Sequence, residues 1–365
     1  TALFQLQYLD KIPQHAIFNE SIEVAKTLGH IGTAKFVTAI LHNISRQGLP
    51  DINAIQNPIQ RLSVEASLPV WLIETLVEQN GEAKTRQIIG SINDAPAQAI
   101  RVNTVLSTDE AVEQALLDEH FTFVKSKVAD HAYVVTGGHV AGSKAYQDGL
   151  LTLQDESAML PVEALQITTQ VKTVLDAAAA PGGKTTQIAQ YIADDATITA
   201  LDIHAHKIRL IEANAKRLHV SDKITAQVLD ARQTANQLTT KFDRILVDAP
   251  CSGFGLLRRK PEIRYDKTLE DVMSLASLQG EILDSVSQNV ADNGMIVYST
   301  CTILRQENDD VIARFLSKHT DFELVPTMTS KALKSNRQET VLHIYPNDYH
   351  TDGFFVATLK KKTVQ

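Results

Sequence analysis

The spacing of apolar positions changes twice along the chain, and the first stretch has the spacing of helices. Apolar side chains recur every three or four residues over 19–28 and 33–46, and those between Phe36 and Ile44 form one stripe. A further helix is expected over 69–80, with Ser67 as its N-cap, Pro69 in its first turn and Gly81 just past its end. The first part of the chain therefore predicts an all-α region.

The second stretch combines short strand-like runs with one helix. Runs at 100–105, 121–128 and 133–135 are rich in β-branched and aromatic residues. Between the first two, Ser107 and Glu110 are spaced as a capping box that opens a helix. This texture predicts a small α+β subdomain.

From residue 151 onward, strand-like and helical patterns alternate. Strands are expected at 171–176, 197–202, 224–229, 243–248, 294–300 and 353–360, and helices at 184–193, 205–218, 271–290 and 305–319. Such alternation predicts an α/β fold with a doubly wound, Rossmann-like parallel sheet and helices on both faces.

These patterns divide the 365 residues into three parts, since the length exceeds one ordinary domain. We expect a helical region over 1–64, a helical linker with the small α+β subdomain over 65–150, and the α/β domain over 151–365. Because the chain opens with Thr1 and enters helical patterns at once, we expect part of the first region to precede it.

Composition narrows the class of protein. A hydrophobic content of 44% with 21% charged residues describes a soluble globular chain. No apolar run approaches the roughly 18 residues of a membrane span, and the start lacks the features of a secretion signal. Two cysteines are too few for a disulfide framework or a zinc site. We therefore expect a cytoplasmic protein with reduced thiols and no bound metal, monomeric and without a membrane partner.

The net charge of −8 by itself disfavours a nucleic-acid partner, but the charge is unevenly distributed along the chain. It is +1 over 1–62, −6 over 63–150 and −3 over 151–365. Within the last part a basic stretch begins seven residues after Cys251, and we expect it to hold phosphates of a nucleic acid locally through Arg258, Arg259, Lys260 and Arg264. The alternative interpretation is a solvated charged loop.

The sequence VLDAAAAPGGKTT (174–186) follows one of the expected strands. It is not a P-loop, because the glycine required five positions before Gly183 is Ala178, and it lacks the G-x-G-x-x-G of a dinucleotide site. What remains is a turn of small side chains against which a ligand can lie. Asp202 ends the next strand, where it can accept both hydroxyls of a ribose, and Asp230 follows at the adenine edge. This layout predicts a site for S-adenosylmethionine.

The carboxylates at these strand ends have a second interpretation. Asp176, Asp202, Asp230 and Asp248 each end an expected strand, and parallel strands bring such ends to one edge of the sheet. Taken singly, an aspartate at a strand end is as often a turn former or a helix cap. Four of them at successive strands favour a ligand site.

The two cysteines, Cys251 and Cys301, each follow an apolar run directly, in ILVDAPCSG and MIVYSTCT. A lone cysteine is usually a small buried apolar residue, but two thiols placed alike with polar neighbours favour a shared site. A thiolate that adds to carbon 6 of cytosine makes carbon 5 nucleophilic enough to accept a methyl group. An acid such as Asp248 can assist at N3, and a cation such as Lys184 or the basic stretch can favour the thiolate.

With these motifs the chain resembles the RNA cytosine-C5 methyltransferases that carry a NusB-like N-terminal domain. The resemblance covers nearly the whole chain and rests on AAAAPGGK (177–184), LDIH (201–204), VDAPCSG (247–253), RRKPEIRY (258–265), YSTCT (298–302), QEN (306–308) and HTDGFF (350–355). It implies S-adenosylmethionine-dependent 5-methylation of a cytosine in 16S ribosomal RNA.

The resemblance also implies roles for single residues. The cofactor would be bound by Ala178, Ala179, Ala180, Pro181, Gly182, Gly183, Lys184, Asp202, Asp230 and Asp248. Cys301 would be the nucleophile and Cys251 would help to release the product, a division that spacing alone does not make. Two alternatives stay open, namely a cytosine-C5 methyltransferase acting on transfer RNA and a catalytically idle RNA-binding protein.

Overall fold

The helical start of the chain forms a unit of its own. The computed structural model describes residues 1–335 and 337–363, and its contacts divide the chain into Thr1–Glu65 and Ala66–Gln365. The expected helices 19–28 and 33–46 lie within α2 and α3, and Ile17, Phe18 and Leu41 pack at the centre of the unit. Its elements are α1 (Ala2–Tyr8), α2 (Gln14–Leu28), α3 (Ile31–Gln47), η1 (Ile52–Ala54) and most of α4 (Pro58–Ala66).

The helix expected over 69–80 continues further than its sequence pattern indicated. Helix α5 spans Val70–Ser91, and Gly81, with φ 75° and ψ 162°, kinks it instead of ending it. Glycine adopts this backbone conformation without steric cost, so the apolar pattern can resume in a new direction. The expected N-cap is also wrong, since Pro69 occupies that position and Ser67 does not.

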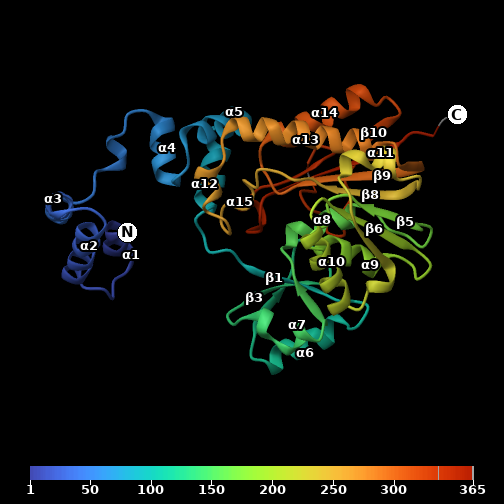
Figure 1. The fold of residues 1–365 in the computed structure, drawn as a ribbon, viewed down its shortest axis with the longest axis horizontal. Coiled ribbons are helices and arrows are strands. Elements are labelled where there is room, and N and C mark those ends of the chain that lie inside the picture. The colour runs from blue at the N-terminus through green and yellow to red at the C-terminus, as the bar shows by residue number, and fades with distance from the viewer. Residues whose placement is uncertain (336, 364–365) are drawn as a thin grey trace. The chain divides into compact units, whose positions relative to one another are not determined.

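The small α+β subdomain is an antiparallel sheet covered by short helices (Figure 1). Its strand order is β2 (Thr122–Lys125), β3 (Ala132–Thr136), β1 (Gln98–Val102) and β4 (Leu151–Leu153). The helices are α6 (Asp109–Asp118), η2 (Val140–Gly142) and α7 (Lys144–Gln147). Helix α6 is capped by the side chain of Thr108, which accepts from the Ala111 amide, and not by Ser107 as expected.

Arg101 links this sheet to the α/β domain. Its side chain leaves β1, is 1% exposed, and donates to the Gly183 carbonyl at 3.3 Å and the Thr186 hydroxyl at 3.1 Å. It also donates to the side chains of Gln154 and Gln190. Burial lowers the pKa of Arg101 to about 9, because these neutral oxygens replace its hydration without supplying a negative charge. The subdomain is thus fixed to the first turn of α9 (Gly183–Tyr191).

The α/β domain has the expected Rossmann-like sheet, with an antiparallel edge that was not expected. Strands β5 (Thr173–Asp176), β6 (Thr197–Asp202), β7 (Ile224–Val228), β8 (Phe242–Asp248) and β9 (Val290–Thr300) pair in parallel in the order β7-β6-β5-β8-β9. Next to β9 come β12 (Phe354–Lys361), β10 (Phe322–Val325) and β11 (Leu342–Ile344), all paired antiparallel. An antiparallel edge on a parallel sheet is common in large α/β proteins.

Helices cover both faces of this sheet (Figure 1). One face carries α13 (Leu269–Ser287) and α14 (Asp309–Lys318), and the other carries α8 (Glu156–Ala164), α9 and α10 (Ala205–Arg217). Strand residues alternate between two apolar cores, for example Ile296 and Tyr298 in one and Val297 in the other. The short elements η3 (Ser221–Lys223), η4 (Ala231–Gln233), α11 (Thr234–Gln237), α12 (Ile263–Asp266), η5 (Arg305–Glu307) and α15 (Pro346–Tyr349) lie in the connections.

Candidate active site

A cavity of about 340 Å³ lies at the carboxyl ends of the parallel strands. The chain runs outward from β5 to β7 and then returns to β8 on the other side of β5, so this edge is the switch point where such sheets bind ligands. The cavity is lined by Ala177, Ala178, Ala180, Asp202, Ile203, Lys207, Asp230, Ala231, Arg232, Asp248, Ala249, Pro250, Cys251, Leu278, Ile282 and Cys301. Both cysteines and three of the four strand-end aspartates therefore meet in one space.

The small-residue turn forms one wall of this cavity. The amides of Ala177 and Ala179 donate to the carbonyls of Leu246 and Leu201, which holds the turn between two neighbouring strands. Gly182 has φ 102°, and a Cβ there would lie 3.1 Å from the Ile211 Cα in α10. The tight turn into α9 thus needs glycine at this position, and the small side chains of the flanking alanines leave space in the cavity.

Asp202 and Asp230 line the cavity while also capping their turns. One Asp202 oxygen accepts from the His204 amide at 2.9 Å, and Asp230 caps η4 through the Arg232 amide. The Arg232 guanidinium also donates a hydrogen bond to the Asp230 carboxylate, and this hydrogen bond is the main reason why the pKa of Asp230 is lowered. The turn-forming and ligand-binding interpretations therefore do not exclude each other at these positions.

Asp176 is the one strand-end aspartate outside the main cavity. It is 1% exposed, and one of its oxygens accepts from the Thr185 hydroxyl at 2.6 Å. Its Oδ1 has no hydrogen-bond partner among the described residues. Burial raises the pKa of Asp176 to about 6. It lines a second cavity of about 230 Å³, which shares Ala178, Ala180 and Asp248 with the first and also contains Asp155 and Lys184.

The two thiols are in contact. The Sγ atoms of Cys251 and Cys301 lie 3.2 Å apart, and both side chains are partly buried. The pKa of Cys251 is raised by its hydrogen bond with Cys301, by burial and by the charges of Cys301, Glu307 and Asp248. This raised pKa favours the protonated form of Cys251, and either sulfur can be the donor in the contact between the two thiols.

Lys184 supplies a positive charge on the side of Cys301. Its Nζ donates to Asp248 Oδ2 at 2.7 Å and lies 5.1 Å from the centre of the Phe354 ring. Burial alone would lower the pKa of Lys184, but the charges of Asp248 and Cys301 raise it. The other Asp248 oxygen accepts from Ser299, its neighbour across the β8–β9 pair. The electrostatic surroundings of the two thiols thus differ, with an ammonium near Cys301 and carboxylates near Cys251.

Glu307 is a buried carboxylate that connects the two cysteine-bearing loops through hydrogen bonds, and sequence reasoning did not predict this role. It is fully buried, and it accepts from the Ser252 amide at 2.8 Å, the Ser252 hydroxyl at 2.5 Å and Gln279 at 3.1 Å. The Ser252 hydroxyl lies 3.0 Å from that of Thr302. Ser252 follows Cys251 and Thr302 follows Cys301, so the carboxylate ties the two loops together. Its place in QEN was the only signal in the sequence.

The four basic residues predicted to bind RNA differ in their surroundings. Arg264 is 7% exposed and donates to carbonyls of Ala66 and Ile92 and to the Asn93 side chain. Arg258 donates to the Thr351 carbonyl, and Arg259 pairs with Asp155 and Asp352. Lys260 is exposed, and its side chain makes no hydrogen bond or ion pair with any residue that the structure describes.

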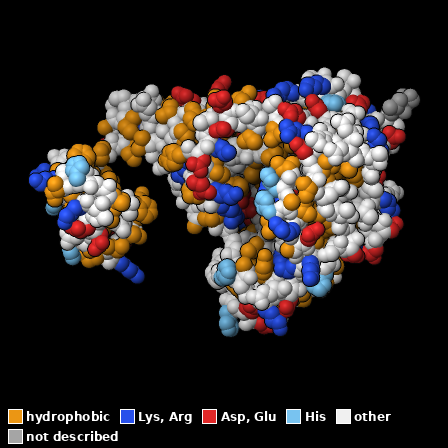
Figure 2. Space-filling view, viewed as in Figure 1, with side chains coloured by type: hydrophobic (Ala, Val, Ile, Leu, Met, Phe, Trp, Pro, Cys, Tyr) orange, Lys and Arg blue, Asp and Glu red, His pale blue; other side chains and the backbone are white. Residues whose placement is uncertain are grey.

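Charged side chains lie over much of the visible face of the larger unit. Figure 2 shows Lys and Arg side chains, with histidines, beside the hollow in the middle of that unit.

Within 1–335 and 337–363, no group of three or more His, Cys, Asp or Glu side chains is arranged to hold a metal ion. No helix in those ranges is long and apolar enough to cross a membrane.

Three family models match successive parts of the chain. Residues 1–46 match the NusB family, residues 68–140 match the ferredoxin-like domain of RsmF/B-like methyltransferases, and residues 163–360 match 16S rRNA methyltransferase RsmB/F. Together the matches follow the change from helices to the small sheet and then to the α/β domain.

Relatives and solved structures resemble nearly the whole chain. The probable ribosomal RNA small subunit methyltransferase B of Bacillus subtilis is 39% identical, over 99% of this chain and 81% of the relative. Its counterpart in Synechocystis is 32% identical, over 98% and 81%. The crystal structure of PH0851 superimposes with a TM-score of 0.84 at 27% identity, over 99% of this chain and 80% of that one.

Proposed function

Because the chain belongs to the 16S rRNA methyltransferase RsmB/F family, we propose that it transfers a methyl group from S-adenosylmethionine to carbon 5 of a cytosine in 16S ribosomal RNA. The observation that carries the proposal is the pair of free thiols, 3.2 Å apart, in a cavity whose other side has strand-end carboxylates. A methyltransferase that modifies a nucleophilic atom directly has no use for such a pair, whereas carbon 5 of cytosine needs a thiolate to activate it.

The residues around the cavity fit the cofactor. We assign its binding to the turn Ala178–Lys184 and to Asp202, Asp230 and Asp248. The alanines leave room along the backbone, Asp202 offers acceptors for the ribose hydroxyls, and Asp230 offers one for the adenine amino group. The unpartnered buried Oδ1 of Asp176, behind the same turn, is a further acceptor suited to a cationic ligand. When bound, S-adenosylmethionine supplies a methyl group on a positively charged sulfur.

We assign the nucleophile to Cys301. Its sulfur would bond to carbon 6 of the cytosine, and the ring electrons pushed onto carbon 5 would make that carbon take up the methyl group. The Lys184 ammonium is close enough to Cys301 for the charge of Cys301 to raise the pKa of Lys184. N3 of the cytosine is an acceptor, so Asp248, whose oxygens accept from Lys184 and Ser299, would have to deliver a proton to it; a protonated N3 makes carbon 6 more electrophilic.

Cys251 is assigned to the second half of the reaction. The proton on carbon 5 has to leave to a base, after which the bond between sulfur and carbon 6 breaks and aromaticity returns. The raised pKa of Cys251 keeps this thiol protonated beside Cys301, where it can return a proton to the departing sulfur. Different protonation states would thus give the paired thiols different tasks.

The remaining parts are proposed to guide the RNA. We assign this role to the helical region 1–64 and to the segment 65–150 with the small sheet. Of the basic residues Arg258, Arg259, Lys260 and Arg264, we propose the direct phosphate contact for Lys260, whose ammonium is exposed. The RNA contacts of the three arginines stay predictions.

The experiment compares Cys301→Ala with Cys251→Ala, a matched pair that removes one sulfur each. Purified protein is incubated with S-adenosylmethionine carrying a labelled methyl group and with 16S ribosomal RNA or transfer RNA, and methylated positions are mapped. Cys301→Ala should abolish incorporation, and Cys251→Ala should accumulate protein joined to RNA on a denaturing gel. Equal partial losses without a joined species would contradict the assigned roles. Incorporation into transfer RNA alone would replace the proposed substrate, and no incorporation into either would favour an idle RNA-binding protein.

A further inference from the structure

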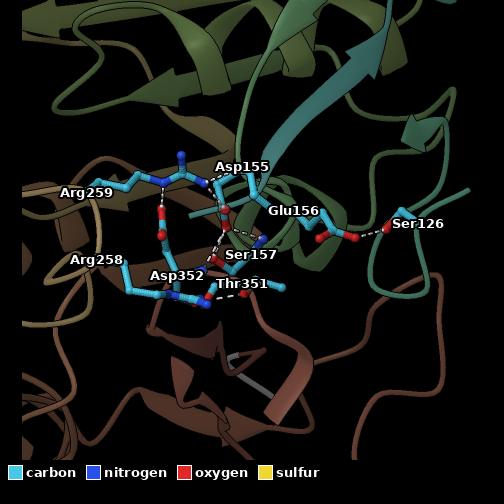
Figure 3. A network of polar contacts seen from close by, with 9 residues as sticks. Ser126, Asp155, Glu156, Ser157, Arg258, Arg259, Thr351 and Asp352 are labelled. Atoms are coloured by element: carbon cyan, nitrogen blue, oxygen red, sulfur yellow. Dashed lines mark hydrogen bonds and ion pairs between the residues drawn. The ribbon is translucent and has the colours of Figure 1, made fainter. Parts of the chain in front are cut away.

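Arg259 belongs to the basic stretch but is turned toward two acidic side chains of its own chain. Its Nε donates to Asp352 at 2.6 Å, and its Nη2 donates to Asp155 at 2.8 Å and to the Ala97 carbonyl at 2.9 Å (Figure 3). About a third of the side-chain surface stays exposed. One guanidinium therefore joins the loop after Cys251 to three other segments of the chain.

The two carboxylates that it bridges are fixed and close to each other. Asp155 caps α8 by accepting from the Ser157 amide, and it also accepts from the Asp352 amide at 3.3 Å. Asp352 is 3% exposed, and burial together with the charge of Asp155 raises the pKa of Asp352 to about 6. Without Arg259, the buried Asp352 and the half-buried Asp155 would face each other with no ion-pair partner in the described part of the chain, and their repulsion would push the segments apart.

The same segments form the wall behind the thiol pair. The Gly255 amide donates to the Cys301 carbonyl and the Gly353 amide donates to the Gly255 carbonyl, each at 2.9 Å. A Cβ at Gly255 would lie 2.1 Å from the Gly353 oxygen and 2.7 Å from the Cys301 oxygen. Displacement of the segment around Asp352 would therefore move the backbone that carries Cys301.

We propose that Arg259 is a positioning residue for the thiol pair, acting through Asp352 and Asp155, and not an RNA phosphate contact. This inference rests on the proposed function, because the thiol pair is assigned there as the reaction centre. Arg258 extends the same arrangement through its hydrogen bond to the Thr351 carbonyl. The guanidinium is suited to the task, since its planar fork holds several N–H donors in fixed directions and here binds two carboxylates at once.

The test compares Arg259→Gln with Lys260→Gln, which remove the same charge one position apart. Binding of a 16S ribosomal RNA fragment is measured over a series of salt concentrations, and kcat and KM are measured for methyl transfer. Loss of one phosphate contact reduces the slope of log affinity against log salt by about 0.7 to 0.9. We expect that reduction, with a raised KM, for Lys260→Gln only. Arg259→Gln should keep the slope and lose kcat by at least about tenfold, roughly the effect of 1.4 kcal/mol on a barrier.

A second readout needs neither RNA nor cofactor, and so separates this inference from the proposed function. Diamide oxidises two neighbouring thiols to a disulfide, and the rate is followed as loss of reaction with a thiol reagent. Arg259→Gln and Asp352→Asn should each change the rate of Cys251–Cys301 disulfide formation at least threefold, and the double variant should change it no further. Should Arg259→Gln not fold, Asp352→Asn alone decides. An unchanged oxidation rate, or a salt slope reduced as much as in Lys260→Gln, overturns the inference.

Discussion

Replacement of Glu307 by alanine tests whether the buried carboxylate holds the two cysteine loops together. The Ser252 amide would lose the acceptor that the structure gives it, at a cost of about 1–3 kcal/mol. The Ser252 hydroxyl and the Gln279 amide keep Thr302 and the Pro250 carbonyl as partners, so each should lose about 1 kcal/mol. The expected loss in free energy of unfolding is therefore about 3–5 kcal/mol, less the relief of removing a buried charge.

The assay can report on this unit alone. Trp71 is the only tryptophan in the chain, lies in the unit that begins at Ala66, and packs edge-to-face on Phe254 at 5.6 Å. Urea unfolding followed by its fluorescence therefore measures the domain that contains Glu307. Burial raises the pKa of Glu307, so its charged form is less favourable in the folded state than in the unfolded chain, and glutamine is an uncharged residue of the same shape.

The matched variant Glu307→Gln separates the acceptor from the charge. It keeps one oxygen for the Ser252 amide and should lose less than half as much stability as alanine does. A Glu307→Ala protein within about 0.5 kcal/mol of the wild type, the usual range for a surface substitution, would refute the reasoning. Equal losses for both variants would show that charge, and not the acceptor oxygen, stabilises the loops.

Two further predictions concern packing and pH. Gly255→Ala should destabilise the domain by about 1–3 kcal/mol, because its Cβ would overlap backbone oxygen atoms. Gly280→Ala, in α13 with open space around its Cβ, should stabilise the domain by up to about 1 kcal/mol. Urea unfolding that gives the opposite order of stability for the two variants would contradict the geometry. The pKa of Asp176 is raised by burial from 3.8 to about 6, so the folded state binds this proton more tightly and stability falls as the pH rises from about 4 to about 6. In Asp176→Asn, the loss of stability between about pH 4 and pH 6 should be smaller by up to about 3 kcal/mol. If stability falls equally with pH in the two proteins, Asp176 is not responsible for the loss.

Much of the fold could be predicted because its elements have strong periodicity. The strands that end in Asp176, Asp202 and Asp248 and the helices α10 and α13 lie within a few residues of their expected bounds. Helix α8 was not predicted, since nearly all of its residues are buried and Pro161 stands in its middle, so no amphipathic stripe exists to be detected. The antiparallel edge was also missed, because the direction of a strand leaves no trace in its composition.

The candidate site shows where sequence reasoning stops. Strand ends predicted that Cys251, Cys301 and Asp248 meet, because one edge of a parallel sheet collects them. The partners of Glu307 and Arg259 lie between 28 and 162 residues away in the chain, and no local pattern indicates which carboxylate faces which loop. A run of basic residues likewise indicates positive charge, but not whether the side chains face solvent or acidic residues of the same chain.

The buried guanidinium of Arg101 bears on how small a fragment of this chain can fold alone. A polypeptide that begins at residue 151 would contain the entire parallel sheet, yet it would lack the donor that satisfies the Gly183 carbonyl and the side chains of Thr186 and Gln154. The Gly183 carbonyl and the Thr186 hydroxyl would keep their hydrogen bond to each other, but both would lose the buried charged donor. The minimal autonomous catalytic fragment therefore has to start upstream of Gln98, and dissecting the enzyme at the apparent boundary near 150 would damage the turn that it was meant to isolate.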